Sequence, residues 1–210
     1  KYEPVVTQTY WENEFNQTLG LPYSHKFSDA WKRSLNEAKP YAEKIKSQHI
    51  RALYLEQSDG KELKVSGPKT YGDTYLKMAG MENVASDLVV KGDAGRYINV
   101  SMEQIIQWDP DVVFVVFGSA KDILNNKNPG QDWHNVKAFK DGKIFSTPVG
   151  LHNWGGLSAE TALLPLFMIN KFNPDYITDA ELKVATRLHY KKVFDYEIPD
   201  ALLTDELRQR

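Results

Sequence analysis

The chain has 210 residues, 41% of them hydrophobic, which is enough to build the core of one α/β domain, alone or with an appended piece. Its formal net charge of −2 provides no bulk positive field and disfavours nucleic acid and anionic membranes as partners. The absence of cysteine excludes disulfides, thiolate catalysis and Cys-based metal sites, and every apolar run is far shorter than the roughly 20 residues that a membrane-spanning helix needs.

The amino-terminal segment, residues 1–26, is polar and aromatic and has no sustained apolar period. We interpret it as an N-terminal remnant or extension, either the tail of something upstream or a lid packed on the surface. The chain starts at Lys1 without a Met or an apolar signal segment, so we expect that it was processed or trimmed.

A long helix is predicted next, over residues 27–48. Its apolar side chains recur near helical spacing, with Ser28 or Asp29 available as an N-terminal cap. Pro40 lies inside this helix and is expected to kink it or to split it in two.

The middle of the chain alternates between predicted strands and predicted helices. Strands are expected at residues 51–56, 62–65, 112–117 and 143–146, with a turn at 58–60; helices are expected at 72–79, 102–108, 120–125 and 133–139. Such alternation is typical of an α/β fold with a mostly parallel, doubly wound sheet covered by helices on both faces. Further helices are predicted at 157–171, where Pro165 is expected to cause a bend, and at 179–194 and 201–208.

One stretch, Val100 to Ser119, joins a capped helix to a buried strand. Ser101 and Gln104 have capping-box spacing, so the helix is predicted to begin near Met102 and to leave Glu103 exposed. The helix should end before Pro110, because the residue preceding a proline is pushed out of the α region. The apolar run that follows predicts a strand covered on both faces.

Three segments with this organisation resemble the C-terminal lobe of the solute-binding proteins that serve ABC importers for ferric siderophores, haem and cobalamin. They are VSGPKTYGDTYLKMAGMENVAS at 65–86, NVSMEQIIQWDPDVVFV at 99–115, and the pair WHNVKAFKDGKIFSTP and GLHNWGGLSAETALLPLFMINKFNPD within 133–175. The resemblance extends from about residue 28 to the end, and its specificity comes from the order and spacing of the three segments.

This resemblance implies two α/β lobes that are joined by a rigid helix and clamp a ligand between them. A single lobe can be recognised here, so we divide the chain into the remnant at 1–26, a lobe-linking helix at 27–48 and a C-terminal binding lobe with closing helices at 49–210. The expected function is extracytoplasmic capture of a metal chelate and its delivery to a permease. Among metal chelates, a ferric siderophore is the expected ligand. The alternatives are a one-lobed interaction or sensor module and a metal-dependent enzyme.

Glu103 matches the family position at which an exposed carboxylate of the C-terminal lobe docks onto arginines of the permease. The alternative is an ordinary solvated helix residue.

Ligands of doubly wound sheets bind at the carboxyl ends of the strands, so the loops after Glu56, Phe117 and Ser146 are the candidate site. In the last of these loops, Trp154 offers a stacking face, with gap filling over the sheet as the alternative. His152 and Asn153 offer a ligand nitrogen and an amide, although a histidine in a loop is more often a surface residue.

Four further residues are weaker candidates for ligand contact. Tyr71 is interpreted either as a cleft wall or as packing at a helix start. Lys69 and Arg96 would counter an anionic siderophore, unless they are simply solvated. Ser119 follows the buried strand where backbone N–H groups can bind an anion.

Catalysis is disfavoured by the motifs. The five histidines have no metal-ligand spacing, and the sequence lacks a Walker loop, a dinucleotide-binding glycine fingerprint and a nucleophile elbow. A site formed by His152 with Glu160 or Asp132 is conceivable, but no spacing calls for it. We therefore expect no catalytic residue, no resident metal and no cofactor.

Overall fold

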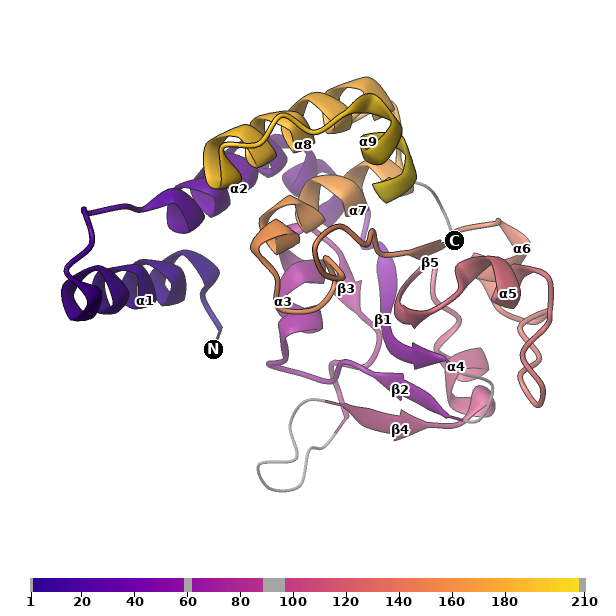
Figure 1. Ribbon diagram of the computed structural model, residues 1–210. Coiled ribbons are helices and arrows are strands. Elements are labelled where there is room, and N and C mark those ends of the chain that lie inside the picture. The colour runs from indigo at the N-terminus through magenta and orange to yellow at the C-terminus, as the bar shows by residue number, and fades with distance from the viewer. Residues whose placement is uncertain (1, 59–61, 89–96, 208–210) are drawn as a thin grey trace.

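The computed structural model describes residues 2–58, 62–88 and 97–207. It consists of one mixed sheet between two layers of helices (Figure 1). The predicted turn at 58–60 lies partly outside these ranges, and Arg96 lies wholly outside them. None of the helices in the described ranges is long and apolar enough to cross a membrane.

The sheet has the strand order β4-β2-β1-β5-β6, and β3 also pairs with β1. The central strands β1 and β5 are parallel, as are β5 with β6 and β1 with β3, whereas β2 runs antiparallel to both β1 and β4. The sequence pattern did not predict β3 or β4. The strand bounds are β1 Arg51–Ser58, β2 Leu63–Val65, β3 Glu82–Asn83, β4 Ile98–Val100, β5 Val112–Gly118 and β6 Ile144–Ser146.

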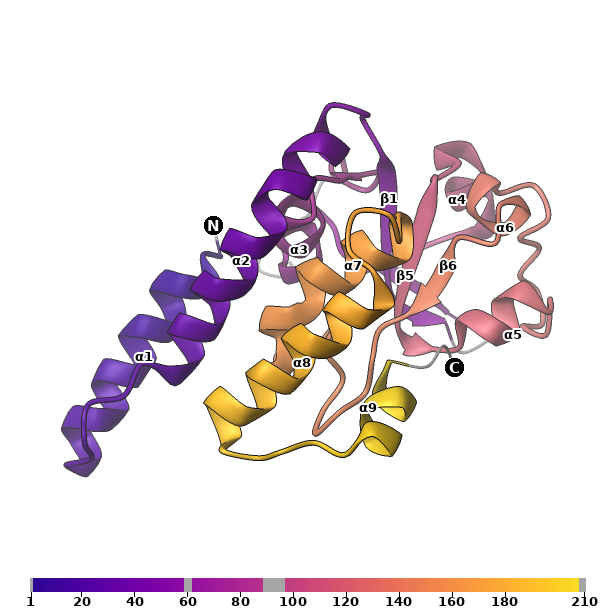
Figure 2. The same cartoon turned by 90° about the horizontal axis from the view of Figure 1, so that it is seen from above.

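Alternate side chains of the central strands enter two separate cores. Tyr54 and Phe114 face the layer formed by α2, α3, α7 and α8, whereas Leu53 and Val113 face α4, α5 and α6. Both layers are visible in Figure 2. The predicted α/β class, with helices on both faces of the sheet, is therefore confirmed. The helices are α1 Pro4–Leu19, α2 Lys26–Lys46, α3 Tyr71–Met78, α4 Met102–Trp108, α5 Ala120–Leu124, α6 Lys137–Lys140, α7 Leu164–Phe172, α8 Asp179–Phe194 and α9 Asp200–Glu206.

The amino-terminal segment contains a helix that its weak periodicity did not indicate. Helix α1 packs along the first half of α2, and the pair projects from the body (Figures 1 and 2). The buried carboxylate of Glu12 accepts hydrogen bonds from the backbone N–H groups of Phe27 (2.7 Å) and Ser28 (3.1 Å). Glu12 thus satisfies the amino-terminal end of α2, a role that the sequence pattern gave to Ser28 or Asp29.

Helix α2 is continuous through Pro40, so of the two expected outcomes, a kink or a split, the split does not occur. Pro40 and Asn36 both lie on the exposed face of the helix. The carbonyl of Asn36, which loses its helical donor at the proline, can therefore bind water instead.

Two other predicted helices are shorter than expected. Within 133–139, the regular helix is α6, which begins at Lys137, because Trp133 and Val136 are committed to the core before the helix starts. The predicted helix 157–171 is a 3₁₀ turn, Ala159–Leu163, followed by α7. Pro165 lies in the first turn of α7, where a proline costs no backbone hydrogen bond.

The predicted cap of α4 is half confirmed. The hydroxyl of Ser101 accepts from the backbone N–H of Gln104 at 3.3 Å, whereas the Gln104 amide donates to Gln107 rather than back to the cap. The bounds predicted for α4 and α8 match the structure.

Candidate ligand-binding site

The carboxyl ends of the parallel strands meet at one edge of the sheet. Ser58 pairs with Gly118, and Val115 pairs with Ser146, so β1, β5 and β6 end side by side as expected from the sequence. At this edge Ser119 caps α5, because its hydroxyl accepts from the backbone N–H of Asp122 at 3.1 Å. The hydroxyl of Ser119 is therefore already engaged in a hydrogen bond. Helix α5 has only five residues, so its N-terminus is a weak candidate for an anion site.

The loop after β6 is held rigidly against the sheet by Asn153. Its side-chain oxygen accepts from the Thr147 hydroxyl (2.6 Å) and from the Gly155 backbone (2.8 Å). Its amide nitrogen donates to the Val116 carbonyl at 2.7 Å. These contacts make Asn153 a residue that positions the loop.

Trp154 and His152 point in different directions from this loop. Trp154 is 0% exposed and packs edge-to-face on Phe167 in the core. The geometry therefore favours the packing role that was weighed for Trp154, and in this conformation its face is not open to a ligand. His152 is exposed, and its ring lies 3.3 Å from the Asn153 carbonyl.

A groove of about 400 Å³ lies between α1, the first turns of α2 and α3, and the segment after the β6 loop. Tyr71, a predicted site residue, forms part of its wall and meets the ring of Tyr2 edge-on, with 4.6 Å between centroids. The sequence analysis assigned no ligand contact to the other lining residues. The lining consists of Tyr2, Thr7, Gln8, Trp11, Phe27, Trp31, Tyr71, Leu157, Ser158, Ala159 and Thr161.

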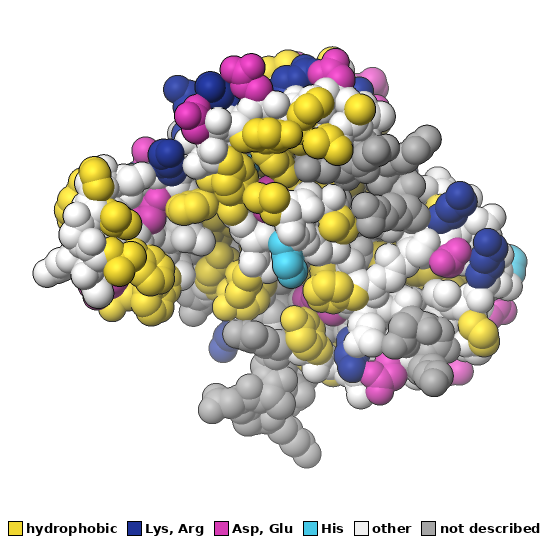
Figure 3. All heavy atoms as spheres, viewed as in Figure 1, with side chains coloured by type: hydrophobic (Ala, Val, Ile, Leu, Met, Phe, Trp, Pro, Cys, Tyr) yellow, Lys and Arg dark blue, Asp and Glu magenta, His cyan; other side chains and the backbone are white. Residues whose placement is uncertain are grey.

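The lining of this groove is aromatic and uncharged. Trp11 is 50% exposed and Phe27 is 37% exposed, so both present ring surface to a ligand. Figure 3 shows hydrophobic side chains gathered over α1 and across the middle of the same face. Flat apolar surface combined with a few hydroxyl and amide groups is typical of sites for organic ligands. This groove can stack against and hydrogen-bond such a ligand.

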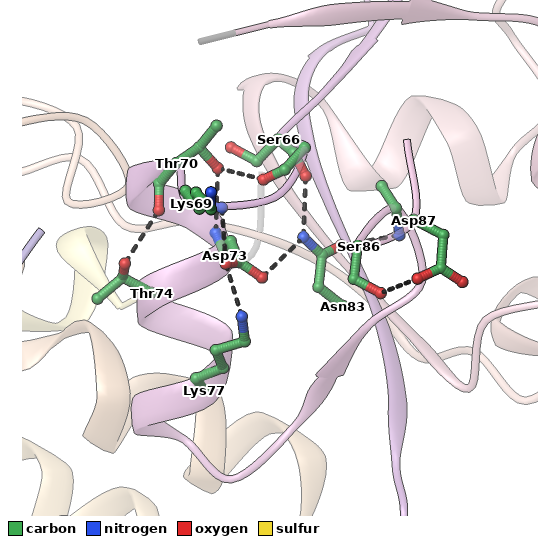
Figure 4. Close-up of polar contacts among 11 residues, drawn as sticks. Ser66, Lys69, Thr70, Asp73, Thr74, Lys77, Asn83, Ser86 and Asp87 are labelled. Carbon is green, nitrogen blue, oxygen red and sulfur yellow. Dashed lines mark hydrogen bonds and ion pairs between the residues drawn. The ribbon is translucent and has the colours of Figure 1, made fainter. Parts of the chain in front are cut away.

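A buried hydrogen-bond network holds the start of α3, and with it Tyr71, in place (Figure 4). The carboxylate of Asp73 accepts from the Lys69 backbone (3.0 Å), from Lys77 Nζ (2.7 Å) and from the Asn83 amide (3.2 Å). The same amide donates to the Ser66 carbonyl at 3.0 Å. Lys69 therefore contributes its backbone to this network, while its side chain is exposed and borders a second hollow beside α1.

Glu56 is a buried carboxylate near the carboxyl end of β1, and the sequence analysis did not select it. It is 6% exposed, and the Ser66 hydroxyl donates a short hydrogen bond to it. Burial raises the pKa of Glu56 to about 7, although the hydrogen bond from Ser66 acts in the opposite direction. The carboxyl group is therefore poised to change its charge near neutral pH.

Glu103 lies in the first turn of α4 and is exposed, as predicted. A hydrogen bond with Ser101, supported by the backbone at the helix start, lowers the pKa of Glu103, so it carries a negative charge at neutral pH. Its carboxylate forms no ion pair with a described residue, whereas Asp122 and Asp132, two other carboxylates on this side of the sheet, pair with Lys127 and His134.

Within the described ranges, no three His, Asp or Glu side chains cluster closely enough to hold a metal ion. Of the predicted site residues, Tyr71 lines the aromatic groove, whereas Glu103 and the residues of the β6 loop do not.

The chain was also compared with known proteins. A family model described as periplasmic binding protein matches residues 23–149, which is more than half of the chain. The chain belongs to the periplasmic binding protein family. The expected resemblance is thereby confirmed, and the match covers α2, the sheet and the start of the β6 loop.

Two curated relatives are similar in sequence. The molybdate-binding protein MolA of Haemophilus influenzae is 28% identical over 134 residues, which are 63% of this chain and 36% of MolA. The Fe(3+)-citrate-binding protein YfmC of Bacillus subtilis is 29% identical over 114 residues, which are 54% of this chain and 33% of YfmC. This family member therefore spans about a third of the length of the curated relatives that it matches.

A solved structure has the same fold. The periplasmic solute-binding protein of Veillonella parvula aligns with a TM-score of 0.68 and 25% identity, over 85% of this chain and 54% of that protein. Named relatives of this chain are thus binding proteins, and the ligands in their names are chemically diverse.

The groove residues of α2 could have been found from spacing, because Phe27 and Trp31 are four residues apart in a predicted helix and lie on one face of it. Those of α1, Thr7 and Trp11, could not, because the weak periodicity of their segment did not indicate a helix. What the sequence did not reveal is that the two helices face each other.

Proposed function

We propose that this chain is the C-terminal lobe and linking helix of an extracytoplasmic solute-binding protein, which captures a metal chelate and delivers it to the permease of an ABC importer. The observation that carries this proposal is the uncharged aromatic groove beside the linking helix, in a member of the periplasmic binding protein family. The lobe binds and presents its ligand and performs no chemistry on it.

The groove supports a largely apolar organic chelate over a strongly anionic ligand. Molybdate and Fe(3+)-citrate, named for the two relatives, are rich in anionic oxygen and need several cationic or N–H donors. No lysine, arginine or histidine is among the described residues that line the groove. Rings such as Trp11 and Phe27 suit the apolar or aromatic surface of a ferric siderophore, which is the ligand class that we propose.

A second lobe is part of this proposal. Helix α1 and the segment after it expose a row of large apolar side chains, which water does not favour. An amino-terminal lobe packed there would bury these side chains and close the open side of the groove. The exposed residues outside the groove are Val6, Tyr10, Phe15, Leu19, Leu21 and Tyr23. The division into a segment at 1–26, a linking helix at 27–48 and a lobe at 49–210 stays a proposal.

Glu103 supports delivery to a permease. An exposed, ionised carboxylate without a cationic partner among the described residues is suited to pairing with an arginine of another protein. Because rim charges act mainly on orientation and association rate, we assign Glu103 to docking rather than to ligand affinity.

The test is a tryptophan-fluorescence titration with hydroxamate and catecholate ferric siderophores, haem, cobalamin, ferric citrate and molybdate. The longer protein that contains this chain is titrated first, and the 210-residue chain is titrated in parallel. Saturable binding of a ferric siderophore is expected from the longer protein, with weaker binding by this chain. The reporter is Trp11, so the Trp11→Phe variant should lose most of the signal.

Three results would contradict the proposal. Preference for molybdate or ferric citrate would remove the ferric-siderophore assignment while keeping the binding function. No response to any compound, together with capture of a folded partner protein, would favour the one-lobed interaction module instead. Catalytic turnover of any of these compounds would favour the alternative of a metal-dependent enzyme.

A further inference from the structure

A small cavity of about 30 Å³ lies between α2 and α8, and none of the residues that line it also lines the aromatic groove. Three of its lining residues carry buried side-chain polar atoms with no hydrogen-bond partner in the structure. These atoms are Nη2 of Arg33, Oγ of Ser34 and Nε2 of His189. Ser34 is 4% exposed and His189 is 3% exposed. Buried polar atoms are rarely left unpaired, so three around one cavity call for a shared partner.

The chemistry of the three atoms defines that partner. The guanidinium of Arg33 can only donate, and the hydroxyl of Ser34 can donate or accept. Burial, and then the charge of Arg33, lower the pKa of His189 to about 4, so the ring is neutral. A hydrogen bond to the backbone of Ala159 uses the other ring nitrogen, which leaves Nε2 with a lone pair and makes it an acceptor.

We propose that this cavity binds one water molecule. The water accepts a hydrogen bond from Arg33 and donates one to His189, and it forms a third with the hydroxyl of Ser34, which can act as donor or acceptor. Water is a small species that both donates and accepts, as this set of atoms requires. A cavity of this size holds about one water molecule, and three polar partners are typical of buried water. A halide ion would satisfy Arg33 but would face the lone pair of His189.

The water would fasten α2 to the C-terminal helix pair. Arg33 and Ser34 lie in the middle of α2, whereas His189 lies in the second half of α8 and packs against the ring of Phe194. Glu37 and Leu188 lie at the outer rim of the cavity, where both are exposed. The bridge would therefore fix the angle at which α2 leaves the lobe.

The direct test is a crystal structure at a resolution that shows ordered water, with a second crystal grown in sodium bromide. The expected result is a single water peak within hydrogen-bond distance of Arg33 Nη2, Ser34 Oγ and His189 Nε2, with no anomalous bromide peak. An empty cavity would overturn the proposal, and so would a bromide ion in the cavity.

Variants provide a second readout. His189→Leu removes the acceptor and should lower the melting temperature by about 2–4 °C. His189→Gln retains a polar end and should keep the water peak and most of the stability. Val184→Ala, at an exposed position of α8, is the matched control and should change neither. An unchanged melting temperature in His189→Leu would count against a bridging water.

Discussion

The phenol of Tyr54 donates a hydrogen bond of 2.7 Å to the carbonyl oxygen of Gly155 and ties the central strand to the loop after β6. Glycines make this contact possible. A Cβ atom at Gly72 would lie 2.3 Å from the Tyr54 ring, and one at Gly155 would lie 2.8 Å from the phenol oxygen. Tyr54 therefore sets the distance between the start of α3 and the β6 loop.

Removing that hydrogen bond should weaken the fold without changing its shape. Tyr54→Phe leaves the carbonyl of Gly155 buried and unpaired, so we expect a loss of about 1–3 kcal/mol in the free energy of unfolding, measured by urea denaturation. Tyr10→Phe, at an exposed position of α1, is the control and should have no effect. Equal stability of Tyr54→Phe and the parent would show that the contact is dispensable.

The turn after α3 should not tolerate a side chain at Gly80. This glycine has φ +80°, and a Cβ atom there would lie 2.0 Å from the Ala42 carbonyl oxygen of α2. Gly142 has φ +65° with no atom within 4 Å, so Gly142→Ala reports the backbone strain alone, about 1–2 kcal/mol. Gly80→Ala should lose clearly more than Gly142→Ala in thermal or urea unfolding. Equal losses would mean that α2 and α3 move apart easily.

Stability should depend on the charge of Glu56. Its pKa is raised from 4.5 to about 7 on folding, so the folded state holds the proton more tightly than the unfolded state. The resulting stabilisation is complete below the unfolded pKa and is lost as the pH rises through about 7, up to about 3 kcal/mol in total.

The measurement is urea denaturation across the range from acid to mildly alkaline pH. The parent should lose stability relative to Glu56→Gln as the pH rises through neutrality, because the amide cannot ionise. Glu14→Gln, at an exposed position of α1, should follow the parent. Parallel curves for the parent and Glu56→Gln would show that the carboxyl ionises freely in the folded state.

Two tryptophans should separate binding from stability. Trp154→Ala empties a fully buried site and should cost about 3–5 kcal/mol of folding free energy. Trp11→Ala removes a half-exposed groove wall and should lower the affinity for the ferric siderophore with little change in stability. Siderophore affinity lost in a folded Trp154→Ala variant but kept in Trp11→Ala would relocate the site to the β6 loop.

Glu103 should matter for delivery and not for capture. Glu103→Arg reverses the charge at an exposed position and should weaken association with the permease, while affinity for the ferric siderophore stays unchanged. Uptake assays and pull-down with the permease measure the effect, and Gln107→Arg on the same helix is the control for added positive charge. Wild-type uptake by Glu103→Arg would remove the docking role.

Local patterns determined much of the architecture. The cap at Ser101 and the turn at Pro110 defined α4 and the start of β5, because capping and proline restrictions act within a few residues. The apolar run of β5 identified a strand covered on both faces, and strand–helix alternation gave the fold class. The exposure of Glu103 likewise followed from its place on an amphipathic helix.

Tertiary structure decided what the local patterns left open. Trp154 looked equally suited to stacking and packing, and its burial against Phe167 depends on how the β6 loop folds back over the sheet. The aromatic groove and the charge state of Glu56 arise where distant segments meet. The sequence by itself thus determined the fold class, the central strands and most of the helices of this protein, because these follow from local patterns. Long-range pairing and packing determined α1, β3 and β4, and desolvation determined which side chains can meet a ligand.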